Sequence, residues 1–211
     1  MKILFIGNSH TYGYGMPYQC REMMKAQRGE VYVGMIAQPG QTLTWHSENP
    51  ATRLALRYEH WDHIILQQAT HPFHGHPELK DAVNALLRLI QGNRSVWLYK
   101  TWCEKEMPGN QVIIDHAFKT MSDELRIPVI PVSDVWHAVE QRDPGHALYD
   151  ADGKHAGAGG SYLTALCMAR ALSRKSVAGL PAVLKHGDTL INQVPPSHAE
   201  LYQRVVMEIM G

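Results

Sequence analysis

Short runs of apolar residues alternate along the chain with longer segments in which apolar positions recur every three or four residues. The short runs are apolar throughout, a pattern typical of strands that are buried on both faces of a sheet. Strands of this kind are predicted at residues 3–6, 31–36, 63–66, 96–99 and 129–132.

The longer segments predict helices. The clearest one begins at Pro77 and carries Leu79, Val83, Leu86 and Ile90 on one face. This spacing is typical of a helix that packs one apolar side against a core. Further helices are predicted at residues 17–28, 54–58, 111–125, 133–139, 160–173 and 198–210.

The alternation of buried strands with helices predicts a fold of the α/β class. Parallel strands need long crossover connections, which the helices supply, and right-handed crossovers place helices on both faces of the sheet. We therefore expect a single domain over residues 1–211 with a three-layer α/β/α, flavodoxin-like architecture. Ligands in such folds bind beside the carboxyl ends of the strands, so the loops after the strands should carry the site.

The charge balance narrows the range of partners. Lys and Arg total 20, as do Asp and Glu, so the formal net charge is zero. A nucleic-acid-binding protein needs a surplus of basic side chains, and a protein held at a membrane surface needs a basic patch. Neither partner is therefore expected. The hydrophobic content of 45% excludes a wholly disordered chain.

The cysteines and the first residues predict a cytoplasmic protein. Cys20, Cys103 and Cys167 are odd in number and far apart, so neither a disulfide framework nor a zinc ribbon is expected. The apolar run after Met1 ends at Ile6. This run is shorter than the ~7–15 residues of a signal-peptide core. The sequence gives no prediction of the oligomeric state.

A serine follows the first predicted strand. The segment Gly7-Asn8-Ser9 places a hydroxyl in a turn at the carboxyl end of that strand. The hydroxyl could be a nucleophile, but serine turns that cap helices are common, and both interpretations fit these residues alone. The segment matches neither a dinucleotide-binding fingerprint nor a P-loop, because the required glycine spacing and Gly-Lys-Ser/Thr are missing.

A second polar motif precedes the helix predicted from Gly160. Asp152 and His155 are three residues apart, which can place a carboxylate and an imidazole on one side of a turn. Such a carboxylate can hold the imidazole in one tautomer and stabilise its protonated form. A glycine-rich loop closed by an Asx turn explains the same residues without any function.

Together the two motifs resemble the SGNH hydrolases, also called GDSL-like esterases. The resemblance extends to the order and spacing of the motifs and to the α/β pattern over nearly the whole chain. It implies that Ser9 is the nucleophile of a triad with His155 and Asp152. Gly40 resembles the glycine of the family's second block, which lends its backbone N–H to the oxyanion hole beside that of the serine.

The third block departs from the family pattern. The family usually carries Gly-x-Asn-Asp after the third strand, whereas this chain has Leu66-Gln67-Gln68. A branch of the superfamily, close to carbohydrate acetylesterases, has Leu-Gln at this place, and the chain resembles that branch. The resemblance implies that the Gln67 amide is the third oxyanion donor. Gln68 is the alternative, because neighbouring strand residues point to opposite faces.

The implied activity is that of a serine esterase that needs no cofactor and acts on a small acyl ester. The branch resemblance favours acetyl groups on a carbohydrate. Aromatic side chains predicted in loops could stack on sugar rings, namely those of Trp45, Phe73, Trp102 and Trp136. A lipid or a thioester is the alternative acyl substrate within the same enzyme class.

A histidine cluster supports a different hypothesis. The segment from residue 71 to 76 contains three histidines, His71, His74 and His76. They could bind a transition metal in a metal-dependent hydrolase. The segment lacks cysteine, and Glu78 is the only acid nearby. We therefore expect the segment to form a polar rim of the active site without a metal. A third hypothesis is a flavodoxin-like binding module without catalytic activity.

Overall fold

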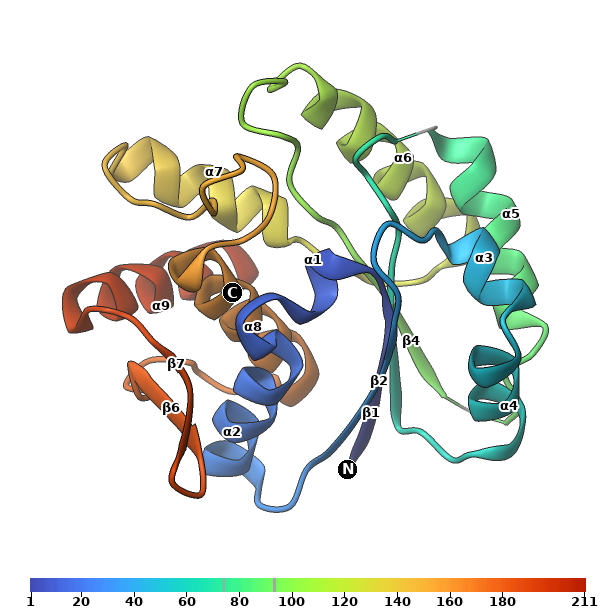
Figure 1. Cartoon of the computed structure of the whole chain (residues 1–211), viewed down its shortest axis with the longest axis horizontal. Helices are drawn as coiled ribbons and strands as arrows, with labels where there is room; N and C mark the ends of the chain where they lie inside the picture. Colours follow the sequence, from blue (N-terminus) through green and yellow to red (C-terminus); the bar gives the residue numbers. More distant parts are fainter. Residues whose placement is uncertain (74, 93) are drawn as a thin grey trace. The chain divides into compact units, whose positions relative to one another are not determined.

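The computed structural model describes residues 1–73, 75–92 and 94–211 of the chain (Figure 1). These residues form two compact units that interleave along the sequence. The first unit contains residues 1–11 and 32–130, and the second contains residues 12–31 and 131–211. The expectation of a single domain stays a prediction, because interleaved units of this kind can form one domain or two.

The first unit is built on a parallel sheet of five strands in the order β2-β1-β3-β4-β5. The strands are β1 (Lys2–Gly7), β2 (Tyr32–Ala37), β3 (His63–Gln67), β4 (Ser95–Tyr99) and β5 (Val129–Ile130). This is the strand order of flavodoxin-like sheets. The predicted α/β class, with a parallel sheet flanked by helices, is confirmed.

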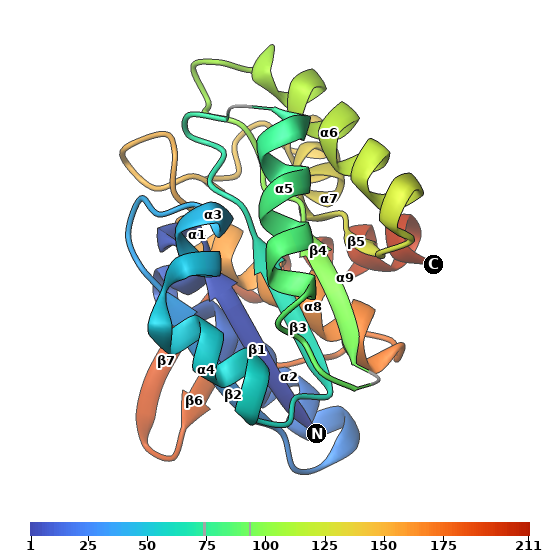
Figure 2. The same cartoon turned by 90° about the vertical axis from the view of Figure 1, so that its right-hand side faces the viewer.

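Besides the short helix α1 (Ser9–Tyr12), the described residues of the first unit form four helices. They are α3 (Leu43–Glu48), α4 (Pro50–Tyr58), α5 (His76–Leu87) and α6 (Asn110–Leu125). Figure 2 shows α3, α4 and α5 over one face of the sheet. The core on this face joins Leu4 and Leu66 of the strands to Leu79 and Val83 of α5, and all four side chains are buried. The apolar stripe predicted for α5 is therefore core.

The second unit is mainly helical. Its elements are the 3-10 helix η1 (Gly13–Gly15), α2 (Met16–Arg28), α7 (Val132–Arg142), α8 (Ala158–Ser173), α9 (Pro196–Met210) and an antiparallel hairpin of β6 (Val183–His186) and β7 (Thr189–Gln193). Helix α8 contacts α2, α7 and α9, and its residues are buried on all sides. This explains why the sequence of α8 lacks a polar face.

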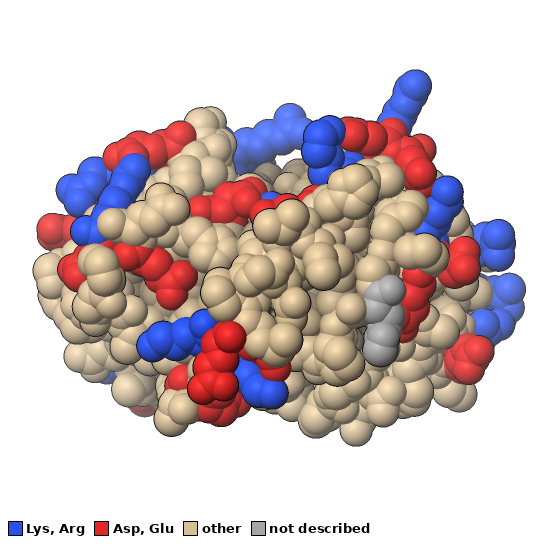
Figure 3. All heavy atoms as spheres, turned by 90° about the horizontal axis from the view of Figure 1, so that it is seen from above, with Lys and Arg blue, Asp and Glu red and all other residues tan. Residues whose placement is uncertain are grey.

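The surface carries charges of both signs. On the face shown in Figure 3, acidic and basic side chains are interspersed, unlike the basic stripe of a nucleic-acid-binding surface. Across the described ranges, none of the helices combines the length and the apolar character that crossing a membrane requires.

Candidate active site

Ser9 lies in a short turn at the carboxyl end of an inner strand. Gly7 is the last residue of β1, and Ser9 is the first residue of the short helix α1 (Ser9–Tyr12), so Asn8 alone joins the two elements. β1 lies between β2 and β3 in the sheet. The structure therefore places Ser9 at the sheet edge where the strand pattern predicted it.

The side chain of Gln67 holds this turn from the end of β3. Its Oε1 accepts hydrogen bonds from the Asn8 backbone N–H at 2.8 Å and from Thr11 Oγ at 2.9 Å. Its Nε2 donates to the Gln68 carbonyl oxygen at 2.6 Å, and the side chain is fully buried. One of the two N–H groups of this amide is thus engaged within the protein, and a role of Gln67 as oxyanion donor through its second N–H stays a prediction.

Gly40 lies in a tight turn close to that of Ser9. The Gln41 N–H donates to the Gln38 carbonyl at 3.2 Å, and Gly40 has a φ of +69°. Proline followed by glycine with positive φ is the signature of a type II turn, in which the Gly40 N–H takes no part in the turn's own hydrogen bond. Asn8 Nδ2 donates to the Gln41 carbonyl at 3.3 Å, so the two turns are joined directly.

Gln68 fixes the segment that follows Gly40. Its Oε1 accepts a hydrogen bond from the Leu43 N–H at 2.9 Å, at the first residue of α3. Within the described residues, its buried Nε2 has no hydrogen-bond partner. The two neighbouring glutamines therefore hold two different segments, the turn of Ser9 and the start of α3 that follows Gly40.

Asp152 and His155 form a close pair in the loop before α8. The His155 Nδ1 lies 2.5 Å from Asp152 Oδ2, and Asp152 Oδ1 accepts the backbone N–H groups of Lys154 and His155, each at 2.9 Å. The hydrogen bond from His155, supported by these N–H groups, lowers the pKa of Asp152 well below its usual range. The ionised carboxylate fixes the proton on Nδ1, so the lone pair of the neutral ring is on Nε2.

The Asx turn predicted for this loop is present, and it places the carboxylate against the ring, so the structural and the functional interpretation of the motif are compatible. Ser9 and Gly40 belong to the first unit, whereas Asp152 and His155 belong to the second. The meeting of nucleophile and base therefore stays a prediction.

Two of the four aromatic residues predicted to stack on sugars are excluded from that role. Trp102 and Trp136 are fully buried. The Trp102 ring contacts that of His10, and Trp136 lies on the buried face of α7. Phe73 is half-buried and packs against the core of the first unit. Trp45 in α3 is partly exposed.

The segment His71–His76 does not assemble a metal site from the residues that are described. His71 packs edge-on against His10 with ring centroids 4.5 Å apart, and His76 faces Glu124 at 3.4 Å. His74 lies outside the described residues. Across the described ranges, no three His, Cys, Asp or Glu side chains are grouped as metal ligands would be. His71 thus contacts the neighbour of Ser9, and the expectation that the segment forms a rim of the active site stays a prediction.

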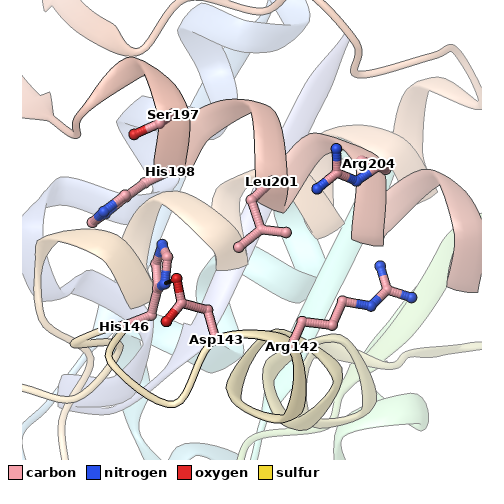
Figure 4. A pocket seen from close by; sticks show the side chains of 7 residues that line it. All are labelled: Arg142, Asp143, His146, Ser197, His198, Leu201 and Arg204. Atoms are coloured by element: carbon pink, nitrogen blue, oxygen red, sulfur yellow. Dashed lines mark ion pairs between the residues drawn. The ribbon is translucent and has the colours of Figure 1, made fainter.

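A second Asp–His pair in the second unit was missed, although it has the same sequence spacing. The His146 Nδ1 lies 2.8 Å from Asp143 Oδ2, and the His146 ring packs against His198 with centroids 3.9 Å apart. The pair lines a cavity of about 520 Å³ between the end of α7 and the start of α9 (Figure 4). Burial and the neighbouring His146 lower the pKa of His198.

Comparison with solved structures identifies the fold. No protein-family model and no curated protein matches the chain. A crystal structure of a DUF4886 family protein from Bacteroides uniformis aligns with 100% of this chain and 94% of its own, at a TM-score of 0.80 and 19% identity.

Two structures with a named enzyme class align as well. A member of the lipolytic protein G-D-S-L family from Veillonella parvula covers 82% of this chain and 97% of its own, at a TM-score of 0.60 and 19% identity. A catalytic mutant of an acetylxylan esterase from Geobacillus stearothermophilus covers 88% and 97%, at a TM-score of 0.56 and 16% identity. The chain has the fold of the SGNH/GDSL-like hydrolases.

Proposed function

We propose that the protein is a serine esterase that hydrolyses small acyl esters through Ser9, His155 and Asp152. The observation that carries the proposal is the Asp152–His155 pair, in which an ionised carboxylate held by two backbone N–H groups orients an imidazole. Such a pair is what a general base for a serine nucleophile requires. The likeness of the fold to lipolytic enzymes and to an acetylxylan esterase supports the proposal.

The reaction proceeds in two halves. Ser9 Oγ attacks the acyl carbonyl while His155 Nε2 takes the hydroxyl proton, and His155 then gives this proton to the departing alcohol. Water attacks the acyl-serine in the second half, and His155 again takes and returns a proton. Asp152 stays ionised throughout and stabilises the imidazolium.

Backbone N–H groups of Ser9 and Gly40 stabilise the oxyanion, and each such donor is typically worth ~3–4 kcal/mol. The family resemblance offers the Gln67 amide as a third donor, with Gln68 as the alternative, and this direct role competes with the positioning role that the contacts of Gln67 suggest. No cofactor enters the reaction. Acetyl on a carbohydrate is the proposed substrate, and of the aromatic residues considered for sugar stacking, Trp45 keeps an exposed face.

A chain-length series of p-nitrophenyl esters tests the proposal. We expect the wild-type protein to prefer acetate, Ser9→Ala to be inactive, and a serine-directed phosphonate to label the wild type but not Ser9→Ala. Ser197→Ala is the matched control, because Ser197 lines the cavity of the other Asp–His pair.

The outcomes separate the hypotheses. Preference for long acyl chains would exclude deacetylation and retain the esterase. Loss of activity with a chelator, restored by zinc, would favour the metal-dependent hydrolase. If the protein hydrolyses no ester and the phosphonate does not label Ser9, the remaining hypothesis is a binding module without catalytic activity.

A further inference from the structure

Gln67 ends β3 and Gln68 follows it, and the two side chains reach different backbone segments. Gln67 and Gln68 are 0% and 1% exposed, so their amides are withheld from bulk water. Gln67 accepts from the N–H of Asn8, and Gln68 accepts from the N–H of Leu43. A buried N–H that loses its partner is costly, so these contacts hold each segment against β3.

The contact of Gln67 depends on the missing side chain of Gly7. A Cβ at Gly7 would lie 2.4 Å from Gln67 Oε1 and 2.4 Å from Thr11 Oγ. Glycine at the end of β1 is therefore required because the Gln67 amide occupies the space of a side chain. From this position one oxygen binds Asn8 and Thr11, which lie on either side of Ser9 along the chain.

His46 holds the same turn through another atom. The Gly7 carbonyl accepts from His46 Nε2 at 2.8 Å and from the Gln38 N–H at 3.1 Å. Because a carbonyl can only accept, the proton of the ring is on Nε2, and Nδ1 accepts from Thr52 Oγ at 3.0 Å. Burial lowers the pKa of His46, which favours this neutral form. The turn before Ser9 is thus fixed on both its carbonyl and its N–H side.

We propose that Gln67 is a positioning residue for the nucleophile and that, with Gln68, it sets the spacing between the Ser9 and Gly40 backbone N–H groups. The inference rests on the proposed function and deepens it. It gives the two glutamines that replace the family's third block a role in pre-organisation: the Gln67 oxygen fixes the turn that carries Ser9, and the Gln68 oxygen fixes the start of α3, three residues after Gly40. A misplacement of ~1 Å in such a site can cost ~10²-fold in rate.

The test pairs turnover with amide hydrogen exchange in two matched variants. In Gln67→Met we expect exchange of the Asn8 N–H to accelerate at least ~10-fold and kcat to fall ~10²-fold, with KM nearly unchanged. Gln68→Met is the control: exchange of the Leu43 N–H accelerates there, while that of Asn8 stays protected.

A milder variant separates positioning from direct donation. Thr11→Val removes one of the two hydrogen bonds to Gln67 Oε1 and leaves the Gln67 amide in place. We expect a several-fold fall in kcat with an unchanged KM. This variant also serves if Gln67→Met does not fold.

Three results are decisive. Unchanged Asn8 exchange in Gln67→Met overturns the proposal. A fall in kcat without faster exchange, together with normal turnover in Thr11→Val, makes Gln67 a direct oxyanion donor and also overturns it. Absence of any Ser9-dependent hydrolysis in the wild type is a failure of the proposed function, and the exchange measurements then still decide whether Gln67 holds the turn.

Discussion

The second unit contains two Asp–His pairs with the same spacing and nearly the same contact. Nδ1 lies 2.5 Å from the carboxylate in Asp152–His155 and 2.8 Å in Asp143–His146. The side chain of His155 is 39% exposed, whereas that of His146 is 7% exposed and packs against His198. The spacing makes the pair, but its surroundings decide whether the second ring nitrogen can serve a substrate.

The two Asp–His pairs also differ in the hydrogen bonds that their carboxylates and rings make. Asp152 accepts two backbone N–H groups besides the imidazole, whereas Asp143 accepts that of Gly145 at 3.1 Å. The Nε2 of His146 is buried, and the described residues offer it no hydrogen-bond partner. A buried Nε2 is poorly placed to exchange protons with a serine and a leaving alcohol, so this difference supports His155 as the proposed base.

The largest expected effect is on turnover. His155→Ala should lower kcat about as much as Ser9→Ala, by up to ~10⁶-fold, the scale known for the serine and histidine of the subtilisin triad. The double variant should be hardly worse than either, because the two residues act as a unit. Steady-state kinetics on p-nitrophenyl acetate measure this.

His146→Ala is the matched control, and it should keep activity within a few-fold while unfolding at a lower denaturant concentration. Near-normal turnover in His155→Ala together with loss in His146→Ala would reverse the assignment of the two pairs.

A smaller effect is expected at the carboxylates. Asp152→Asn keeps the shape but cannot fix the tautomer or stabilise the imidazolium, so kcat should fall by ~10⁴-fold. Asp143→Asn should leave kcat within about two-fold, since the proposed reaction does not use the Asp143–His146 pair. Measuring kcat of both variants on p-nitrophenyl acetate tests this difference. Equal losses would show that Asp152 has no special part in catalysis.

The sequence predicted those parts of the fold that depend on local pattern. Residues 3–6 and 64–66 are apolar throughout because these strand positions are buried. β1 extends its prediction by one residue at each end, and β3 extends its prediction by one residue. The hairpin of β6 and β7 was missed, because most of its residues are exposed and its strands show no sustained alternation of buried and exposed positions.

The candidate site divides in the same way. The Ser9 turn and the Asp152–His155 turn were predictable, because each is made by residues that are adjacent or three apart. The contact of Gln67 was not, since it depends on the register that pairs Ile6 with Leu66 and so brings the next residue of β3 to the turn after β1.

Trp102 and Trp136 were wrong as exposed residues. Residues 133–139 were predicted as a helix, but the pattern was not used to decide which face of that helix is buried, and Trp136 lies on the buried face.

The smallest expected effect is on the pH dependence of stability, and it concerns the His146 pair. Burial and the adjacent His146 lower the pKa of His198 below its ordinary value of 6.5. The unfolded chain therefore binds more protons at this residue, and stability should fall as pH drops through that ordinary value towards the lowered one.

Replacing His146 by Phe should weaken this dependence. The ring contact is kept, but a like charge is removed and Asp143 loses its partner, and both changes raise the pKa of His198. We expect its ring proton signal to titrate at higher pH in His146→Phe, and urea unfolding to vary less with pH. His155→Phe should leave both measurements unchanged. If His155→Phe shifted the titration of the His198 ring signal as much as His146→Phe does, the two pairs would not be independent. The distinction between an exposed reactive pair and a packed pair would then be wrong.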